Sequence, residues 1–496
     1  MIRRRFLTSA LLALALLPHA RAEFPVTRKP RAVPPPPQGS YQVFPDQPRQ
    51  IIKGLGFEIQ SDSIGSGNHG LPAEFSGVPH DLTPGERERF YKEMLHGFRY
   101  CRLAAGLYWR GLDPDQKYFQ ERWPGQAAEL KEMIQQAGIE GVSFEYWSPA
   151  PYWKASGRLV GQSPGTCLRC FSKSFANDPV YHGDVDRFLA DYGQAIRRDL
   201  QTLRDAGIPI TMWGLQNEPF ANTPYSSCIY TPQTYSKTFL AVAPVVRAFD
   251  PKIWITADDA NMGYVRPALQ NPANMGLIDA FVVHDVGGNS KDVRKPLSDQ
   301  RPGYQNEYEY LAGPTSPDRC LNTVQHIMNW FQLAEAPTWF WIHALKPVGN
   351  SEASGYALGF WRAPDYKGPL GAQFAGLQPG HWTWNPYNWY AVAGFLRHMP
   401  WNSQAVTVHE DRKDDDLRIF AFKRPDGKLV IVLSNRSGSP FTFDINTGLT
   451  AATFTGYRYT PQDAGPDFNG QMIATASSNS FAPQLATGSW EFWVQN

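Results

Sequence analysis

Apolar strand-like runs alternate with amphipathic helical stretches along most of this chain, and this alternation constrains the fold more than any other feature. The runs that we assign to strands span 54–61, 97–104, 141–147, 209–216, 253–258, 279–285, 303–308 and 338–344. Strands separated by helices form parallel sheets, and eight such units in succession are typical of a closed (β/α)8 barrel. The sequence therefore predicts an α/β fold, a TIM barrel, over residues 49–400.

Helical stretches fill the intervals between these runs. They are expected at 86–95, 125–137, 184–206, 232–249, 319–334 and 389–398. Gly138 and Gly207 directly follow two of them. Glycine is common just beyond a helix because it adopts the left-handed conformation without a steric penalty.

The pattern changes after about Pro400. Residues 417–423 alternate between apolar and polar, Arg424-Pro-Asp-Gly427 is a turn sequence, and an apolar run resumes at 428–433. Two such runs joined by a turn predict a β-hairpin. We expect residues 401–496 to form an antiparallel β-sandwich appended to the barrel, and a contribution of strands from 40–52 is left open.

The N-terminus has the features of an export signal. Arginines precede an apolar run at 6–17, and Ala20-Arg-Ala22 has the form of a cleavage site. Residues 1–22 are therefore interpreted as a signal peptide, which predicts a secreted or periplasmic protein. Residues 23–48 are rich in proline and are expected to form an extended leader.

Charge and hydropathy exclude several classes of partner. The chain has 47 Lys and Arg against 46 Asp and Glu, and no block of one sign stands out, which argues against a nucleic-acid partner. No later apolar run approaches the length of a spanning helix, so we expect no membrane insertion. The 16 Trp and 22 Tyr include rings in loop-like segments, where they suit stacking on sugars. The sequence does not predict the oligomeric state.

The five cysteines are an odd number, so at least one thiol stays unpaired within the chain. Cys101 lies in an apolar run and is expected to be a buried free thiol. Cys167 and Cys170 have no second pair at zinc-site spacing, so a disulfide in a loop is favoured over a metal site. The pairing of these residues with Cys228 or Cys320 is left open.

A glutamate stands at the end of the fourth apolar run, in Trp213-Gly-Leu-Gln-Asn-Glu-Pro219. Proline cannot continue a strand ladder, so the strand ends just past Glu218. The carboxyl ends of barrel strands are where (β/α)8 enzymes place catalytic groups. An Asn beside a Glu suits a sugar, because the amide binds a hydroxyl while the carboxyl handles the proton of the glycosidic oxygen. The motif predicts a glycoside hydrolase, which needs a second carboxylate.

The second candidate lies in the seventh run, Gly303-Tyr-Gln-Asn-Glu-Tyr-Glu-Tyr310. Glu307 and Glu309 have the same parity, so a regular strand turns both to one side. Glu307 is nearer the expected strand end, but alternation alone does not choose between them. A closed barrel brings the ends of non-adjacent strands to one central site, where this carboxylate can meet Glu218.

These motifs resemble those of glycoside hydrolase family 30, whose members are retaining (β/α)8 enzymes with a C-terminal β-sandwich. The matching segments are Gln216-Asn-Glu-Pro219, Asn306-Glu-Tyr308 and Tyr146-Trp-Ser-Pro-Ala-Pro-Tyr-Trp-Lys154, and Ala257-Asp-Asp259 and Val282-Val-His284 agree in kind. The likeness extends over about residues 40–496. It implies Glu218 as acid/base and Glu307 as nucleophile, acting on a glycan without a cofactor or a metal.

Four polar side chains are expected beside the two carboxyls. Asn217 is assigned to the 2-hydroxyl of the sugar, and Tyr308 or His284 to a hydrogen bond with the nucleophile or the sugar ring. Arg102, on the second strand, is expected to hold a carboxylate in its ionised form or, equally, to serve as a salt-bridge partner in the barrel interior. Because the mechanism requires Glu218 to be protonated at rest, we expect its pKa to be raised.

Aromatic side chains are expected to complete the site. Trp147, Trp341 and His284 are assigned to the first sugar subsite, although both indoles also fit a hydrophobic core. The stretch 346–389 is long and is expected to wall off one end of the substrate site. Its tryptophans include Trp361, Trp382 and Trp384.

The chain departs from the family pattern in places that leave the substrate open. Asn306 stands where Ser or Thr is commoner, and Glu58 and Asp62 stand where many relatives have small residues. Asp258 and Asp259 fit a solvated turn or a hydrogen-bonded strand end better than metal ligands. The rival interpretation is a non-catalytic carbohydrate-binding or cell-envelope protein built on a barrel that has lost activity.

Overall fold

The computed structural model describes residues 36–59, 77–260, 263–294, 300–310, 313–348, 357–463, 469–477 and 479–496. The predicted signal peptide, most of the predicted leader and Asp62 lie outside these residues. Among the described residues, no helix combines the length and the apolar character needed to cross a membrane.

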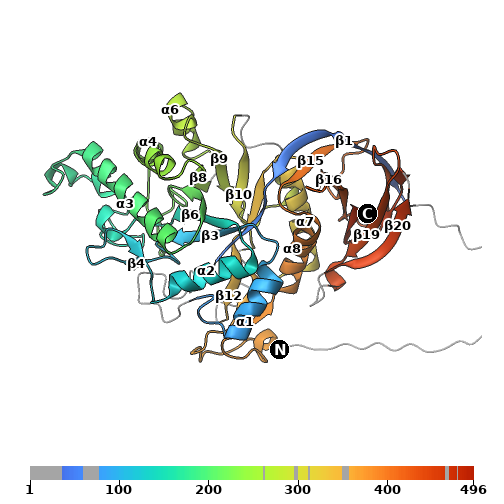
Figure 1. Ribbon diagram of the computed structural model, residues 1–496, viewed down its shortest axis with the longest axis horizontal. Helices are drawn as coiled ribbons and strands as arrows, with labels where there is room; N and C mark the ends of the chain where they lie inside the picture. Colours follow the sequence, from blue (N-terminus) through green and yellow to red (C-terminus); the bar gives the residue numbers. More distant parts are fainter. Residues whose placement is uncertain are drawn as a thin grey trace, which may run out of the picture. The chain divides into compact units, whose positions relative to one another are not determined.

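An eight-stranded parallel sheet forms the predicted barrel (Figure 1). Its strands are β2 (Gly54–Glu58), β3 (Tyr100–Ala105), β6 (Gly141–Tyr146), β7 (Ile210–Gly214), β8 (Trp254–Ala260), β9 (Ala280–His284), β10 (Gly303–Glu307) and β11 (Thr338–Trp341). They neighbour one another in chain order, and the ring closes where Tyr308 bridges Trp341. The predicted TIM barrel is confirmed, with strand ends shifted by a few residues.

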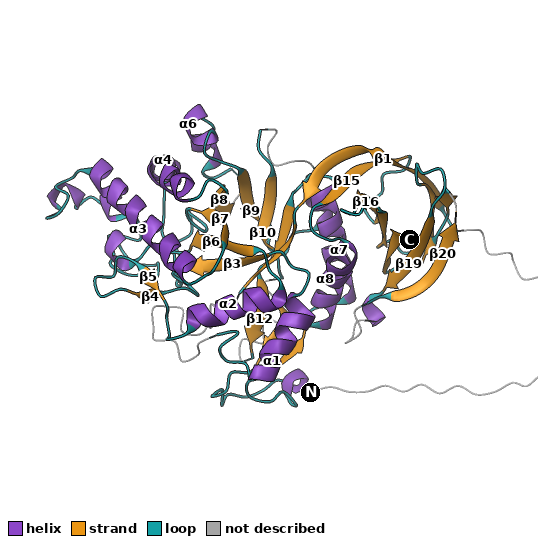
Figure 2. Ribbon diagram, viewed as in Figure 1, coloured by secondary structure: helices purple, strands orange, loops and turns teal. Residues whose placement is uncertain are grey.

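Helices cover the outside of the barrel, as Figure 2 shows. They are α1 (Pro84–Arg89), which continues as the π-helical η2 (Phe90–Leu95), α2 (Gln126–Ala137), α3 (Val185–Asp205), α4 (Pro232–Phe249), α5 (Arg266–Leu269), α6 (Pro272–Met275), α7 (Pro317–Gln332) and α8 (Pro386–His398). Local sequence sets several of their starts. The Asp184 carboxylate accepts from the Arg187 N–H at the start of α3, and Thr231 and Thr234 form a capping box at α4.

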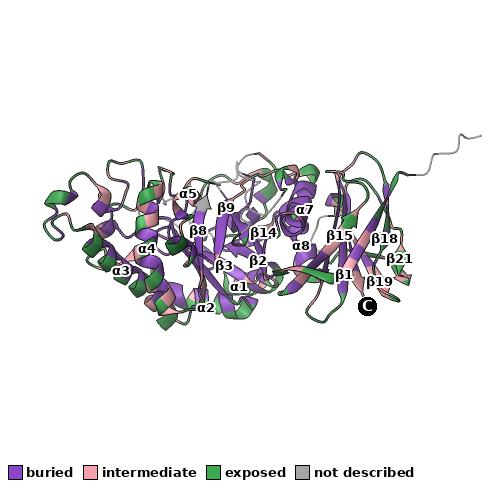
Figure 3. Cartoon of the chain, turned by 90° about the horizontal axis from the view of Figure 1, so that it is seen from above, coloured by how far each residue is buried: buried purple, intermediate pink, exposed green. Residues whose placement is uncertain are grey.

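Aromatic rings pack inside the barrel. Phe340 of β11 stacks on Tyr100 of β3 and Tyr304 of β10, with ring centroids 6.1 and 5.8 Å apart. Gly56 of β2 makes this possible, because a Cβ there would lie 2.2 Å from the Phe340 ring. Figure 3 shows the barrel strands as buried elements. Apolar packing therefore fills this part of the barrel and leaves the carboxyl ends of the strands to polar groups.

Small elements lie between the main strands and helices of the barrel and of the sandwich. They are β12 (His343–Pro347), β13 (Ala357–Trp361) and β14 (Trp382–Trp384) in one sheet, β4 (Gly111–Leu112) and β5 (Phe119–Gln120) in another, and the 3-10 turns η3 (Pro151–Trp153), η4 (Arg169–Phe171), η5 (Phe175–Asn177), η6 (Ser290–Asp292), η8 (Ala372–Phe374) and η9 (Pro461–Asp463). Trp361 is buried and donates to Asp81. Trp382 is buried with the Arg89 guanidinium 3.9 Å from its ring centre. These two tryptophans stabilise the fold rather than offering an open surface for sugars.

The C-terminal region forms the predicted antiparallel sandwich. Its strands are β15 (Ser403–Glu410), β16 (Leu417–Lys423), β17 (Leu429–Asn435), β18 (Phe441–Asn446), β19 (Thr453–Tyr459), β20 (Gln471–Ser477), β21 (Ser480–Phe481), β22 (Gln484–Leu485) and β23 (Ser489–Gln495). β16 and β17 pair as the predicted hairpin, with Lys423 opposite Leu429.

One strand of the sandwich comes from the N-terminal side of the barrel. β1 (Gln38–Ile52) pairs antiparallel with β15, next to which Figure 1 shows it. It also pairs parallel with β18. Residues 38–48, which we predicted to be part of an extended leader, are therefore a strand. The reason is that Tyr41 and Val43 are buried in the sandwich core, while Pro48 sits at a register shift where a missing N–H is tolerated.

All five cysteines are free thiols in the structure. Cys101 is buried on β3, as predicted. The disulfide expected at Cys167 or Cys170 is not formed. Cys170 lies buried in η4 and behaves as a small core residue.

Candidate active site

Glu218 stands just beyond β7, in a strained backbone conformation. The Asn217 N–H donates to the Tyr146 carbonyl (2.7 Å), which extends the contact with β6 by one step. Glu218 then takes a left-handed φ of 44°. Gln216 supports this turn, because its amide donates to the carbonyls of Trp147 and Asn217 (2.9 and 2.7 Å). Such strain persists only where surrounding contacts hold it, and it is frequent at functional sites.

A β-bulge in β10 turns Glu307 into the barrel. Gln305 pairs with Val283 and Glu307 with His284, so Asn306 is an extra residue in β10. Bulges re-aim side chains next to active sites. Asn306 donates to Glu145 (3.1 Å), while Glu307 accepts from Arg102 (2.5 Å). Two consecutive side chains therefore face the interior, which a regular strand forbids.

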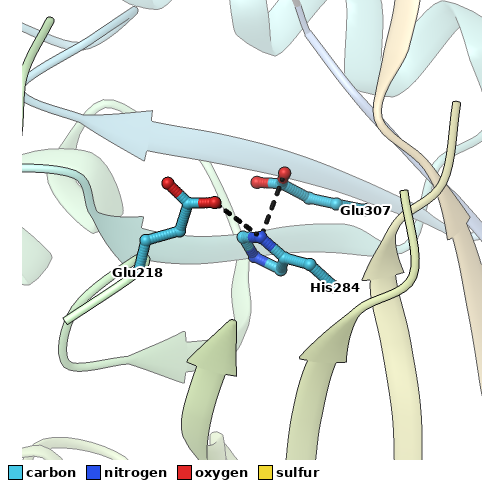
Figure 4. Close-up of side chains that lie close together, drawn as sticks. All are labelled: Glu218, His284 and Glu307. Atoms are coloured by element: carbon cyan, nitrogen blue, oxygen red, sulfur yellow. Dashed lines mark hydrogen bonds and ion pairs between the residues drawn. The ribbon is translucent and has the colours of Figure 1, made fainter. Parts of the chain in front are cut away.

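The structure separates the two candidate nucleophiles. Glu309 is buried and shares a hydrogen bond with Nδ1 of His343 (2.7 Å). Glu307 instead lies beside His284, whose Nδ1 is 3.2 Å from Glu307 Oε2 and 3.3 Å from Glu218 Oε1 (Figure 4). Of the two candidates that the sequence left open, Glu307 is the one that lies close to Glu218.

The two carboxylates are close enough to act on one sugar. An oxygen of Glu218, an oxygen of Glu307 and a ring nitrogen of His284 all lie within 4.8 Å of one another. The side chain of Glu218 is 25% exposed and that of Glu307 is 6% exposed. Retaining glycosidases hold their carboxyls about 5–5.5 Å apart, and inverting enzymes hold them about 6.5–9.5 Å apart. Oxygens this close place both carboxyl groups within reach of one sugar ring.

Arg102 organises the buried side of the site. Its Nη1 donates to Glu58 (2.6 Å) and to Glu307 (2.5 Å). Its Nη2 donates to Asn217 (2.7 Å) and to Glu145. The guanidinium is fully buried, so Arg102 is a salt-bridge partner in the barrel interior that also contacts Glu307. One positive charge faces three carboxylates.

The charges set the protonation of the pair. Burial raises the pKa of Glu218, but the hydrogen bond with His284 and the charges of His284 and Arg102 outweigh it and hold that pKa below its ordinary value. Burial raises the pKa of Glu307, and its attraction to His284 and Arg102 does not offset the effect. Burial lowers the pKa of His284, but the charges of Glu307 and Glu218 bring it above its ordinary value. The expected rise in the pKa of Glu218 is therefore wrong for the free protein, because His284 lies against it.

Two predicted sugar contacts lie elsewhere. The Tyr308 hydroxyl donates to Tyr310 (2.8 Å), and its ring lies 4.2 Å from His326 of α7. Trp341 is fully buried, with its ring 5.7 Å from Tyr308 and 6.2 Å from Trp339. The inward turn of Glu307 sends Tyr308 outward, so these two rings join a core cluster next to α7 and not the carboxylate pair.

Trp147 lies at the site but is nearly covered. It is 2% exposed, and its ring lies 5.8 Å from the Arg102 guanidinium and 5.5 Å from the Tyr225 ring. Asp258, considered as part of a strand end, is buried and pairs with Arg266 (3.0 Å).

Two residues of the site were missed by sequence reasoning. Tyr225 donates from its hydroxyl to Oε2 of Glu218 (3.4 Å), and it lies in a loop whose sequence carries no periodic signal. Glu145 lies on β6 between Phe144 and Tyr146, and a charge inside a buried parallel strand was the available signal.

Solved structures share this architecture. The chain is similar to the catalytic domain of GH30 xylanase C from Talaromyces cellulolyticus, with 14% identity, coverage of 92% of this chain and 100% of that chain, and a TM-score of 0.67. It is similar to a glycoside hydrolase family 30 subfamily 8 xylanase from Clostridium acetobutylicum, with 15% identity, 92% and 99% coverage, and a TM-score of 0.62. An endo-beta1,6-glucanase follows with 16% identity, 93% and 94% coverage, and a TM-score of 0.62. The fold is thus that of glycoside hydrolase catalytic domains.

Part of the sandwich matches a family model. Residues 402–464 match the glycosyl hydrolase family 30 beta sandwich domain. The resemblance to family 30 that we drew from the barrel motifs is confirmed by this separate part of the chain. A sequence search of curated proteins finds no match.

Proposed function

We propose that the protein is a retaining β-glycoside hydrolase that cleaves a polysaccharide or oligosaccharide by double displacement. The observation that carries the proposal is the carboxylate pair, with oxygens of Glu218 and Glu307 within 4.8 Å of each other. Glu307 ends β10 and Glu218 stands beyond β7, so a sugar bound at the carboxyl ends of the barrel strands meets both side chains.

In the first step, a Glu307 oxygen attacks the anomeric carbon while the bond to the glycosidic oxygen breaks. Glu218 gives its proton to the leaving oxygen, and a glycosyl ester forms on Glu307. In the second step, Glu218 takes a proton from water, whose oxygen attacks the anomeric carbon and releases Glu307 as a carboxylate. Asn217 is assigned to the sugar 2-hydroxyl, and Arg102 and His284 stabilise the Glu307 charge.

Substrate binding raises the pKa of Glu218, which then takes from solvent the proton that the first step needs. A sugar seated between the carboxylates separates Glu218 from His284 and removes water from its partly exposed side chain. Loss of the hydrogen bond and loss of water both raise the pKa of a carboxyl group. Glu218 therefore becomes the acid in the complex, although its pKa is lowered in the free protein.

Activity assays identify the sugar and the linkage that the protein cleaves. Similar folds include two xylanases and an endo-beta1,6-glucanase, so β-linked xylan and β-1,6-glucan are the first substrates to offer. We also infer export, because residues 1–22 have the form of a signal peptide. N-terminal sequencing of the exported protein is expected to begin at Glu23, and an intact Met1 would contradict export by cleavage.

A substrate panel with matched variants tests the proposal. Purified protein is offered aryl β-glycosides and plant, fungal and bacterial polysaccharides, with and without a chelator. Hydrolysis is expected in wild type and is expected to be lost in Glu218→Gln on natural glycans and in Glu307→Gln on all substrates. Glu309→Gln is the matched control, because it removes a neighbouring buried carboxylate that pairs with His343.

Two results would point elsewhere. Glycan binding without any turnover, unchanged in Glu307→Gln, supports the rival non-catalytic binding protein. Loss of activity with the chelator favours a metal-dependent hydrolase at the Glu218, His284 and Glu307 cluster.

A further inference from the structure

Both oxygens of Glu218 are held by side chains. Oε1 faces Nδ1 of His284 (3.3 Å), on the side toward Glu307 (Figure 4). Oε2 accepts from the hydroxyl of Tyr225 (3.4 Å). The two contacts differ in their further partners, because His284 also contacts Glu307. The two oxygens of the proposed acid/base therefore have different surroundings.

The loop that carries Tyr225 is anchored on two sides. The Tyr225 carbonyl accepts from the Gly161 N–H (3.0 Å). The next residue, Ser226, donates to the Gly106 carbonyl (2.5 Å) and bridges Val160. The Tyr225 ring lies 5.5 Å from the Trp147 ring. Loops after β3 and β6 thus fix a hydroxyl against an acid that follows β7.

We propose that Tyr225 is a positioning residue that directs the transferable proton of Glu218 to Oε1. The proposal rests on the proposed glycosidase function. The Tyr225 hydroxyl occupies Oε2, so a proton on the carboxyl group resides on Oε1. Oε1 faces Glu307, and the glycosidic bond of a bound substrate lies between the two residues. The proton passes from Oε1 to the leaving oxygen, and the resulting carboxylate keeps its hydrogen bond from Tyr225.

Four groups face Glu218 and set its titration: His284 from β9, Arg102 from β3, Glu307 from β10 and Tyr225 itself. Burial and the charges of Glu218 and Glu307 raise the pKa of Tyr225, so it stays a neutral donor. Its hydrogen bond favours the ionised form of Glu218. Removing the hydroxyl is therefore expected to raise the pKa of Glu218 and to move the alkaline limb of kcat/KM to higher pH.

The test is the dependence of Tyr225→Phe on the leaving group. A natural oligosaccharide needs its leaving oxygen protonated, whereas a dinitrophenolate leaves without help. We expect kcat/KM to fall about 10-fold or more on the oligosaccharide and to change less than about 2-fold on the dinitrophenyl glycoside. Tyr264→Phe is the control, because it removes a hydroxyl that donates to the Tyr230 carbonyl (2.9 Å) in the same region.

Several outcomes overturn the proposal. Equal losses on both substrates mean that Tyr225 only supports the fold, and no loss on either means that Oε2 needs no partner. An alkaline limb of kcat/KM that stays at the same pH in Tyr225→Phe also contradicts the proposal. Should Tyr225→Phe be too unstable to assay, Tyr225→Met goes through the same comparison and must give the same split. Wild type without turnover, or Glu218→Gln with full turnover of oligosaccharide, instead rejects the glycosidase function and takes this proposal with it.

Discussion

Arg102 meets more negative charge than one guanidinium neutralises. Glu58, Glu145 and Glu307 all accept from it, and each of these side chains is buried. Burial and the charges of Glu307 and Glu145 raise the pKa of Glu58 to about 8, against the attraction of Arg102. Glu58 therefore keeps its proton at neutral pH, which removes one negative charge from the surroundings of Arg102.

The pH dependence of stability tests this protonation. Because the pKa of Glu58 is raised from 4.5 to about 8 on folding, its stabilising effect is present below pH 4.5 and is lost as pH rises through about 8. Glu58→Gln has the shape of the protonated acid but does not titrate, so its stability does not fall as pH rises through about 8. We expect the free energy of unfolding of the variant, relative to wild type, to rise by a few kcal/mol between pH 5 and 8.

Denaturant titrations of both proteins across that pH range measure the difference. A difference that stays constant with pH would show that folding does not raise the pKa of Glu58.

The acid/base role of Glu218 predicts chemical rescue. Glu218→Ala is expected to lose about 10²–10⁴-fold in kcat on natural glycans. It is expected to form the glycosyl ester from a dinitrophenyl glycoside, because that leaving group needs no acid. Azide in place of water then speeds turnover and gives a β-glycosyl azide. Product analysis by NMR checks this, and an α-azide would assign Glu218 to the nucleophile instead.

At the scale of single residues, sequence reasoning found most of the site but not its geometry. Glu218, Asn217, His284 and Arg102 were identified because strand ends in a barrel converge. The inward turn of Glu307 depends on the bulge at Asn306, which strand alternation does not contain. Tyr308 was misplaced for the same reason.

At the scale of elements, the fit between neighbouring strands makes a quantitative prediction. Gly56→Ala would place a methyl group 2.2 Å from the Phe340 ring, and Phe340 is held between Tyr100 and Tyr304. We expect a loss of about 1–3 kcal/mol of unfolding free energy from the forced repacking. Adding Phe340→Leu to the Gly56→Ala variant should recover part of the lost unfolding free energy.

A double-mutant cycle by thermal or denaturant unfolding measures this coupling. Additive effects of the two changes would show that Gly56 and Phe340 do not share space.

The elements differed in how well the sequence predicted them. The barrel strands were found because parallel strands buried on both faces are continuous apolar runs. β1 was assigned in large part to the leader because its prolines and polar residues hide its alternation, and its partners β15 and β18 lie hundreds of residues away. A pairing so distant leaves no local signal.

At the scale of the whole molecule, residues 37–496 form one compact unit. Phe331 of α7 stacks on Phe420 of β16 (6.0 Å), and Arg436 donates to Asp318 at the start of α7 (3.0 and 3.2 Å). The hydrophobic core runs from the barrel into β16, β17 and β23 without a break.

This shared core predicts cooperative unfolding. Barrel and sandwich are expected to melt in one calorimetric transition, and a chain ending at residue 400 is expected not to fold, because α7 and α8 would lose their apolar cover. Two separate transitions, or a soluble and active truncated barrel, would show that the parts are independent.

The configuration of the first product tests the central claim most directly. Proton NMR during hydrolysis of a β-glycoside reports the anomeric form of the sugar before it equilibrates in water. Two carboxylates whose oxygens lie within 4.8 Å of each other predict that the β-anomer appears first, through an ester on Glu307. An α-anomer as the first product would contradict double displacement by Glu218 and Glu307.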